Sequence, residues 1–260
     1  MQAVAEVARV AGDIALRAYR TGLSVEIKSD GSPVTVADRA AESAAREWIG
    51  ARFPADGILG EEHGEVRPDA ARRWIIDPID GTKSFVRGVP LWGTLIAVCE
   101  GEHVLAGAVY LPAADGELIA AGRGCGAWHG GVRCRVSDTA RISDATVLTT
   151  DPLFAHRPDR RDAWERVSAD AAVSRSWGDC YGYVLVATGR ADVMVDAALA
   201  PWDAAALMPV IEEAGGVFTS WEGVPTAFGR SAVATNTALA TAVRARLAKA
   251  VRPEHLQHGR

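Results

Sequence analysis

The sequence predicts a mixed α/β fold of two closely packed subdomains, on three observations. Apolar residues recur at helical spacing over residues 3–20. Short apolar runs rich in β character, separated by glycine turns, then follow. After about residue 141 strands and helices alternate. We therefore expect an N-terminal α+β subdomain over residues 1–140 and a C-terminal α/β subdomain over residues 141–260, with a cleft between them.

The first subdomain is predicted to begin with two helices and to continue as a sheet. The first helix spans residues 3–20 and ends near Gly22. Residues 30–33, Asp-Gly-Ser-Pro, indicate a turn, and a second helix over residues 36–51 has Thr35 as its expected cap. The apolar runs that follow predict a largely antiparallel meander, with strands at residues 58–59, 74–76, 91–99, 104–111 and 118–121.

The second subdomain is predicted from shorter elements. Its strands are expected at residues 147–149, 191–195 and 231–235, and its helices at residues 160–167, 183–188, 204–214 and 237–250. Gly215-Gly216 ends the third of these helices, and Pro209 should kink it because proline has no N–H to donate.

Composition excludes several classes of protein. The 260 residues are 48% hydrophobic and 23% charged, as in ordinary globular proteins, and the net charge of −5 without a Lys/Arg run argues against nucleic-acid partners. Charged residues interrupt the first twenty positions, which argues against a signal peptide, and no apolar run approaches the ~20 residues of a membrane span. The four scattered cysteines indicate reduced thiols and a cytoplasmic location rather than a zinc site or disulfides.

One acidic segment suggests a metal site. Residues 74–76 form an apolar strand that runs directly into Asp77-Pro-Ile-Asp80-Gly-Thr82. Two carboxylates three residues apart across a proline turn can converge on one point, and the carbonyl of Ile79 can face the same point. These are hard oxygen ligands of the kind that Mg²⁺ prefers. The alternative is an ordinary turn in which both aspartates bond their own backbone.

Three further acids have both a structural and a functional interpretation. Glu61 alone is typical of a solvated loop, Asp203 alone of a first helical turn, and Asp38 alone of a solvent-facing helix position. Considered singly, each favours the structural interpretation.

Together these segments resemble the inositol monophosphatase superfamily. The matching segments are Gly60-Glu61-Glu62, Asp77 to Thr82, Trp202-Asp203-Ala204-Ala205-Ala206, Ala214-Gly215-Gly216 and Ser231 to Asn236. The resemblance extends from Lys28 to about Asn236. It implies a layered αβαβα fold and a phosphomonoesterase with two to three Mg²⁺ ions.

The resemblance also implies roles for individual residues. Glu61, Asp77 and the Ile79 carbonyl would hold one ion, and Asp77, Asp80 and Asp203 a second, with a third, looser ion near Glu61. Thr82 and Asp38 would orient and deprotonate the attacking water. The amides of Gly81 and Thr82 would position the phosphoryl group.

The substrate is predicted from the second half of the chain. Residues 175–183, Arg-Ser-Trp-Gly-Asp-Cys-Tyr-Gly-Tyr, are similar to a segment of the histidinol-phosphatase members, and so are residues 77–90 with the following Trp92. Histidinol carries an ammonium group, and Asp179 could pair with it, whereas a polyol needs only neutral hydrogen bonds. Arg175 could contact substrate or pair with an acid across the cleft. The alternative for Asp179 is the N-cap of the following helix.

Other functions stay open at this point. An inositol or sugar phosphate is the second substrate class, because family membership does not fix the leaving group. A regulatory binding module that has kept the fold should have lost a metal carboxylate, and here all remain. A Ca²⁺-binding protein lacks support because no twelve-residue ligand loop is present. The resemblance also implies a homodimer.

Overall fold

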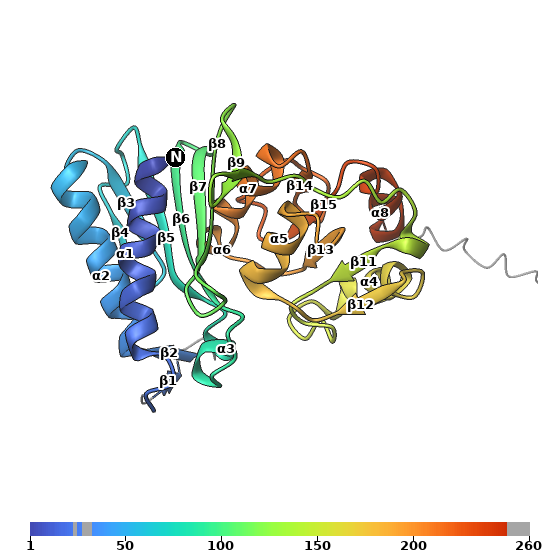
Figure 1. The fold of residues 1–260 in the computed structure, drawn as a ribbon, viewed down its shortest axis with the longest axis horizontal. Helices are drawn as coiled ribbons and strands as arrows, with labels where there is room; N and C mark the ends of the chain where they lie inside the picture. Colours follow the sequence, from blue (N-terminus) through green and yellow to red (C-terminus); the bar gives the residue numbers. More distant parts are fainter. Residues whose placement is uncertain (23–24, 28–32, 249–260) are drawn as a thin grey trace, which may run out of the picture.

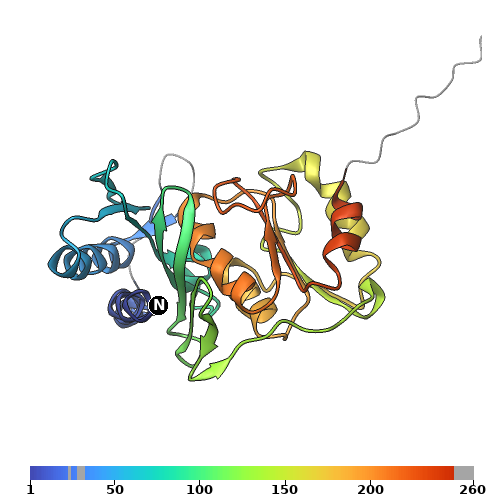
Figure 2. The same cartoon turned by 90° about the horizontal axis from the view of Figure 1, so that it is seen from above.

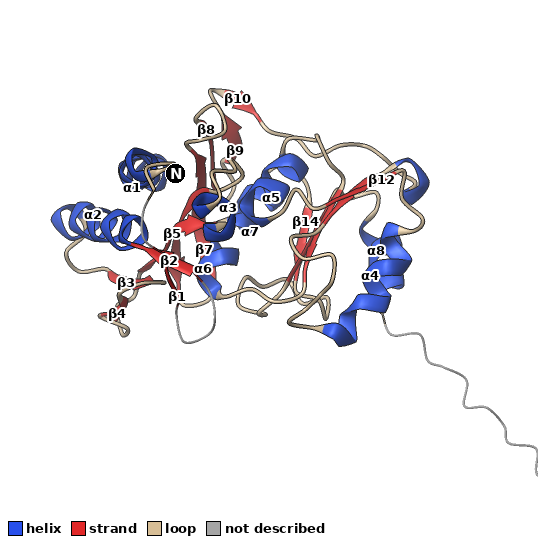
Figure 3. Ribbon diagram, turned by 90° about the horizontal axis from the view of Figure 1, so that it is seen from below, coloured by secondary structure: helices blue, strands red, loops and turns tan. Residues whose placement is uncertain are grey.

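The computed structural model describes residues 1–22, 25–27 and 33–248 as five stacked layers (Figures 1 and 2). Helices α1 (Gln2–Ala18) and α2 (Val36–Arg52) form the first layer, against an eight-stranded sheet. Helices α5 (Asp179–Ala187), α6 (Pro201–Ala205) and α7 (Leu207–Glu213) lie between that sheet and a five-stranded one. Helices α4 (Arg161–Ser168) and α8 (Ala240–Leu247) cover the outer face (Figure 3). The predicted αβαβα fold is confirmed.

The predicted N-terminal helices are present with nearly the expected bounds. Small side chains of α1, such as Ala8 and Ala11, are fully buried, so the helix packs closely on the sheet. Thr35 caps α2 as predicted, since its side chain accepts a hydrogen bond from Ala37 N at 3.1 Å. A short antiparallel pair, β1 (Val25–Ile27) and β2 (Pro33–Thr35), precedes α2.

The eight-stranded sheet is largely the predicted antiparallel meander. Its order is β10-β9-β8-β7-β6-β5-β3-β4, and the pair β3–β5 is parallel. The strands are β3 (Gly57–Gly60), β4 (Gly64–Val66), β5 (Arg73–Asp80), β6 (Gly93–Glu100), β7 (His103–Leu111), β8 (Glu117–Gly122), β9 (Gly126–His129) and β10 (Val132–Arg133). The short helix α3 (Thr82–Val86) follows β5 directly.

The five-stranded sheet is mixed and has the order β12-β11-β13-β15-β14. Its strands are β11 (Thr146–Leu148), β12 (Val173–Arg175), β13 (Val193–Asp196), β14 (Val217–Thr219) and β15 (Ala232–Thr235), and two 3₁₀ turns lie at Ile142–Asp144 and Pro158–Arg160. All its strands follow residue 140 in the chain, so the predicted boundary falls between the sheets. One hydrophobic core nevertheless joins them, because Ile75 and Leu95 of the first sheet pack in the same cluster as Tyr183 and Phe218. The division into subdomains stays a prediction.

Several boundaries differ from the prediction for identifiable reasons. The helix expected over residues 204–214 is divided into α6 and α7 at Ala206. Pro209 explains the division, since it cannot donate to the carbonyl four residues earlier. Helix α5 begins earlier than expected and α8 later, and the exposed strands β4 and β10 were not predicted. The expected turn at residues 30–33 and the end of the last helix lie mostly outside the described residues.

Among the helices of the described part of the chain, none combines the length and the apolar character that a membrane crossing requires.

Candidate active site

The acidic turn at the end of β5 forms one wall of the site. The register of β5 with β6 shifts between Asp77 and Asp80, because Pro78 interrupts the ladder. Asp77 is 1% exposed, and its Oδ1 accepts a hydrogen bond from Ile79 N at 3.0 Å. Thr94 Oγ1 holds the turn from behind by donating to the Pro78 carbonyl at 2.8 Å. Asp80 Oδ2 accepts from Cys180 N at 2.5 Å, which ties the turn to α5.

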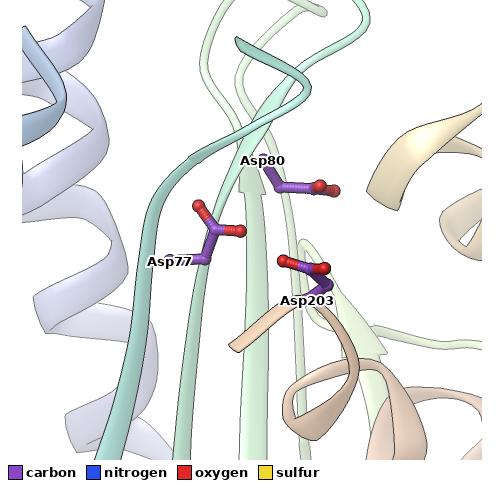
Figure 4. Close-up of side chains that lie close together, drawn as sticks. All are labelled: Asp77, Asp80 and Asp203. Atoms are coloured by element: carbon purple, nitrogen blue, oxygen red, sulfur yellow. The ribbon is translucent and has the colours of Figure 1, made fainter. Parts of the chain in front are cut away.

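Asp203 completes the acidic group from the other side of the cleft. It lies in the first turn of α6, where its Oδ2 accepts a hydrogen bond from Ala200 N at 2.8 Å. One carboxylate oxygen from each of Asp77, Asp80 and Asp203 lies within 4.8 Å of the others. Figure 4 shows the three carboxylates directed toward one another, from β5 and from α6.

The electrostatics of this group fit a divalent cation. Burial raises the pKa of Asp77 well above its usual range, and the charges of Glu61, Asp80 and Asp203 raise it further. Burial and the charges of Asp179 and Asp203 do the same to the pKa of Asp80. Asp77 is buried and Asp80 and Asp203 are half-buried, so the three carboxylates repel one another unless a cation or protons neutralise them. Since all the ligand atoms are hard oxygens, the donor set suits Mg²⁺.

Glu61 and Ile79 lie beside this group. Glu61 follows β3, and its amide donates to the Ile76 carbonyl at 3.3 Å. Both residues line the same cavity as the three aspartates. The closely spaced acidic group found among the described residues consists of the aspartates alone, so Glu61 borders the group rather than joining it.

Gly81 and Thr82 form the turn between β5 and α3. Gly81 has φ 87°, a left-handed conformation, and its carbonyl accepts from Ser84 N and Phe85 N. Thr82 Oγ1 donates to the Ile79 carbonyl at 3.0 Å. Both residues line the cavity next to Asp80, where they were predicted to meet a phosphoryl group.

A second acidic pair, Asp179 and Asp196, comes from the C-terminal half of the chain and lines the same cavity. Asp179 begins α5 with φ 52°, and its amide donates to Thr150 Oγ1 at 2.8 Å. Asp196 ends β13, and its carboxylate accepts from Thr150 N and from the Tyr183 hydroxyl, both at 3.0 Å. The pKa of Asp179 is raised to about 7, mainly by burial and also by the charges of nearby carboxylates. The pKa of Asp196 is raised to about 6, mainly by burial.

The sequence interpretation missed Asp196, Thr150 and Tyr183. Asp196 follows Val193-Met194-Val195, an apolar strand that ends in a carboxylate as residues 74–77 do. The pattern of an apolar strand ending in a carboxylate could therefore have identified Asp196 from the sequence. Thr150 and Tyr183 carry no such signal, because their role depends on which strand ends meet.

Two predicted site residues lie away from the cavity. Asp38 is buried at the start of α2, where its Oδ2 accepts from Thr35 N at 2.8 Å and from Thr35 Oγ1 at 2.7 Å. Asp38 is 1% exposed, so the structural alternative of a solvent-facing position is wrong, and burial raises its pKa. Arg175 is exposed, and its guanidinium donates to the Ser174 carbonyl at 2.7 Å. Neither is among the described residues that line the cavity.

The alternative role of Asp179 as a helix cap is also wrong. Gly178 is the N-cap of α5, and no side chain caps that helix. Asp179 instead faces the cavity from the first helical position.

The acidic residues described above, apart from Asp38, line one cavity of about 1210 Å³ between the two sheets. The cavity is also lined by Lys83, His156, Arg157, Leu199, Trp202, Phe228 and Arg230. The cavity thus contains an acidic group suited to cations, a second acidic pair, and apolar and basic walls.

Comparison with known proteins identifies relatives of the whole chain. The model of the inositol monophosphatase family matches residues 1–255. The histidinol-phosphatase of Chlorobaculum parvum is 44% identical over 92% of this chain and 93% of its own length. The histidinol-phosphatase of Mycobacterium tuberculosis is 42% identical over 86% of this chain and 88% of its own length.

More distant relatives carry other names. An inositol-1-monophosphatase of Rhizobium meliloti is 37% identical over 77% of each chain. Among solved structures, an extragenic suppressor protein of Bartonella henselae superimposes with a TM-score of 0.89 at 32% identity, covering 96% of this chain and 99% of the other.

Proposed function

Because this chain belongs to the inositol monophosphatase family, we propose that it hydrolyses L-histidinol phosphate to L-histidinol and phosphate. The observation that carries the reaction type is the meeting of Asp77, Asp80 and Asp203 in the lining of one cavity. Two relatives named histidinol-phosphatase support the substrate, since each aligns with more than four fifths of the chain.

The metal ligands are proposed to be Asp77, Asp80 and Asp203, joined by Glu61 and the Ile79 carbonyl. Two to three Mg²⁺ ions bound there would lower the pKa of an attacking water and offset the charge of the phosphate. The backbone donors that fix Asp77, Asp80 and Asp203 each hold one carboxylate oxygen, and so orient the other toward the centre.

The remaining steps are assigned to side chains around the phosphate. Thr82 is proposed to orient the attacking water, and the amides of Gly81 and Thr82 to bind a phosphoryl oxygen. Asp38 is proposed to accept the proton. Its raised pKa suits a base, but its carboxylate is held by Thr35, so it must act through a change of partner or through water.

Specificity is proposed to come from the second acidic pair. Histidinol carries an ammonium group, and Asp179 and Asp196 offer it two carboxylates in one part of the cavity. Burial raises the pKa of both Asp179 and Asp196. A bound ammonium group would lower these pKa values again and so favour the ionised carboxylates. The inositol part of an inositol phosphate carries no positive charge that could pair with these two carboxylates.

An inositol or sugar phosphatase is the second candidate, because the relative of Rhizobium meliloti carries the inositol name. A non-catalytic binding role is disfavoured, since Glu61, Asp77, Asp80 and Asp203 are all retained around the cavity. A homodimer and a cytoplasmic location are part of the same proposal, and sedimentation of the purified protein would test the first.

The test is phosphate release from L-histidinol phosphate, myo-inositol 1-phosphate and fructose 1,6-bisphosphate, each with Mg²⁺ and with EDTA. We expect histidinol phosphate to be hydrolysed orders of magnitude faster than the others, and EDTA to abolish the activity. A faster polyol or sugar phosphate would overturn the substrate but keep the mechanism. No turnover with Mg²⁺ would overturn the proposed activity.

A further inference from the structure

A buried glutamate outside the cavity contacts the turn that carries Glu61. Glu42 lies on α2, and its side chain is 0% exposed. Its Oε2 accepts a hydrogen bond from Glu62 N at 2.7 Å, and its Oε1 accepts from His63 N at 3.2 Å. The two residues that directly follow Glu61 are therefore bonded through their backbone to one buried anion.

The same anion is paired with Arg46, one helical turn along α2. Arg46 Nε donates to Glu42 Oε1 at 2.7 Å, and Arg46 Nη2 donates to the Gly64 carbonyl at 2.5 Å. The guanidinium is only 15% exposed. Glu42 and Arg46 together hold both the start and the end of the turn between β3 and β4.

Gly60 makes this contact possible. A Cβ atom on Gly60 would lie 2.1 Å from Glu42 Oε1, closer than any real contact. A side chain at residue 60 would thus displace the carboxylate from beneath the turn. The φ of Gly60 is not left-handed, so backbone conformation does not require glycine at this position. The close approach of the Glu42 carboxylate to the backbone of residue 60 does.

Glu42 itself is not among the described residues that line the cavity, whereas Glu61 is. The charge of Glu61 is the largest effect on the pKa of Asp77 after burial, which places Glu61 close to the acidic group. We propose that Glu42, supported by Arg46, is a positioning residue that sets the affinity of the metal site by fixing the backbone that directly follows Glu61 and by packing against Gly60, which precedes it. This inference rests on the metal site of the proposed function.

The chemistry of the contact supports a positioning role. A buried ion pair adds little net stability compared with apolar packing, because both ions must be removed from water. A carboxylate that binds two successive amides does, however, define the direction of that backbone. Loss of a group that orients a metal ligand typically lowers metal affinity or activity 10- to 100-fold.

The substitution Glu42→Gln tests the proposal. Glutamine keeps the volume, but its NH₂ group must face Arg46 or one of the two amides, so one contact opens. We expect the Mg²⁺ concentration for half-maximal effect to rise roughly 10- to 100-fold. It should rise both in phosphate release and in the thermal stabilisation by Mg²⁺ measured without substrate. At saturating Mg²⁺, kcat and KM should stay within about twofold of the wild type.

Glu117→Gln is the matched control. Glu117 accepts two hydrogen bonds from Arg190, at 2.9 and 2.6 Å, is 19% exposed, and does not line the cavity. This variant should lose stability without any change in the Mg²⁺ midpoint. If Glu42→Gln behaves in the same way, Glu42 is only structural and the proposal is overturned.

The variant Arg46→Gln and the response of the wild type to Mg²⁺ provide two further tests. If Glu42→Gln does not fold, Arg46→Gln leaves the carboxylate in place and should raise the Mg²⁺ midpoint in the same direction by a smaller factor. An unchanged midpoint there would overturn the proposal. If the wild type itself shows no stabilisation by Mg²⁺, the metal site of the proposed function fails and this inference fails with it.

Discussion

At the scale of single residues, Asp179 is held in a conformation that side chains rarely adopt. Its φ of 52° is left-handed, and its amide is bonded to Thr150 rather than within the helix it begins. Backbone strain of this kind costs about 1–3 kcal/mol and gathers at binding sites. The strain places the carboxylate in the cavity, 3.1 Å from where a Cβ on Gly81 would lie.

Asp179 should therefore discriminate between cationic and neutral leaving groups. We expect Asp179→Asn to raise KM for histidinol phosphate about 10- to 100-fold, the effect of losing a charged hydrogen bond of roughly 1.5–3 kcal/mol. KM for a polyol phosphate should change much less. Asp170→Asn, which removes an exposed aspartate paired with Arg246, is the control. Equal effects on both substrates would remove Asp179 from the specificity argument.

The raised pKa of Asp196 predicts how the free energy of unfolding depends on pH. Its folded pKa of about 6 lies above the ordinary 3.8, so the folded state holds this proton more tightly than the unfolded state. The resulting stability is present below about pH 4 and is lost as pH rises through about 6. Since each pKa unit corresponds to ~1.4 kcal/mol, the loss approaches ~3 kcal/mol.

The measurement is urea unfolding in EDTA at pH 4.5 and pH 7.5, for the wild type and Asp196→Asn. Asparagine cannot ionise, and about a third of the wild-type loss already lies below pH 4.5, so the variant should gain about 2 kcal/mol relative to the wild type between the two pH values. A difference between the proteins that is independent of pH would mean that Asp196 titrates normally.

At the scale of elements, the β5–α3 turn depends on Gly81. An alanine there would adopt a left-handed φ at a cost of about 1–2 kcal/mol. Its Cβ would also lie 3.0 Å from the Leu91 carbonyl oxygen and 3.1 Å from Asp179 Oδ2. We expect Gly81→Ala to lose both stability and most of kcat/KM, measured by thermal unfolding and phosphate release.

Gly116→Ala separates the two effects. Gly116 has φ 67°, and a Cβ there would meet nothing within 4 Å. This variant should lose comparable stability, about 1–2 kcal/mol, and keep its activity. Equal loss of activity in the two variants would show that strain alone, and not the contact with Asp179, explains the result of Gly81→Ala.

The elements that the sequence predicts well are those with a strong local signal. Helices α1 and α2 have long apolar periodicity, and Thr35 is a good cap, so both were predicted within about two residues. Strand β10 is exposed and strand β12 is mostly half-buried; both are short, and each forms because a neighbouring strand pairs with it. No residue pattern within such a segment indicates its partner.

At the scale of the whole molecule, the acidic group depends on topology. Strand β5 of the first sheet supplies Asp77 and Asp80, and α6, packed between the sheets, supplies Asp203 (Figure 4). The local sequence around Asp203 predicts only an acid in a first helical turn. Its meeting with Asp77 followed from the family resemblance, not from any spacing within this chain, because nothing local fixes which helix faces the end of β5.

A cation at this group would join the two sides of the cavity and so stabilise the whole fold. Binding only to the folded state adds about 2.7 kcal/mol at a concentration 100 times Kd. For a chain of this size that corresponds to a rise in Tm of roughly 5–10 °C. We expect Mg²⁺ to produce this rise in the wild type.

Asp203→Asn should remove most of the rise. Asparagine can still accept from Ala200 N, so the start of α6 should keep its cap while the site loses one anionic ligand. The measurement is thermal unfolding with EDTA and with increasing Mg²⁺, and the Tm in EDTA should change by no more than a few degrees. If Mg²⁺ stabilises the variant as much as the wild type, the ion binds elsewhere. Protons would then have to offset the repulsion between Asp77 and Asp80, whose pKa values are raised. Phosphate release would in that case depend on pH rather than on the Mg²⁺ concentration.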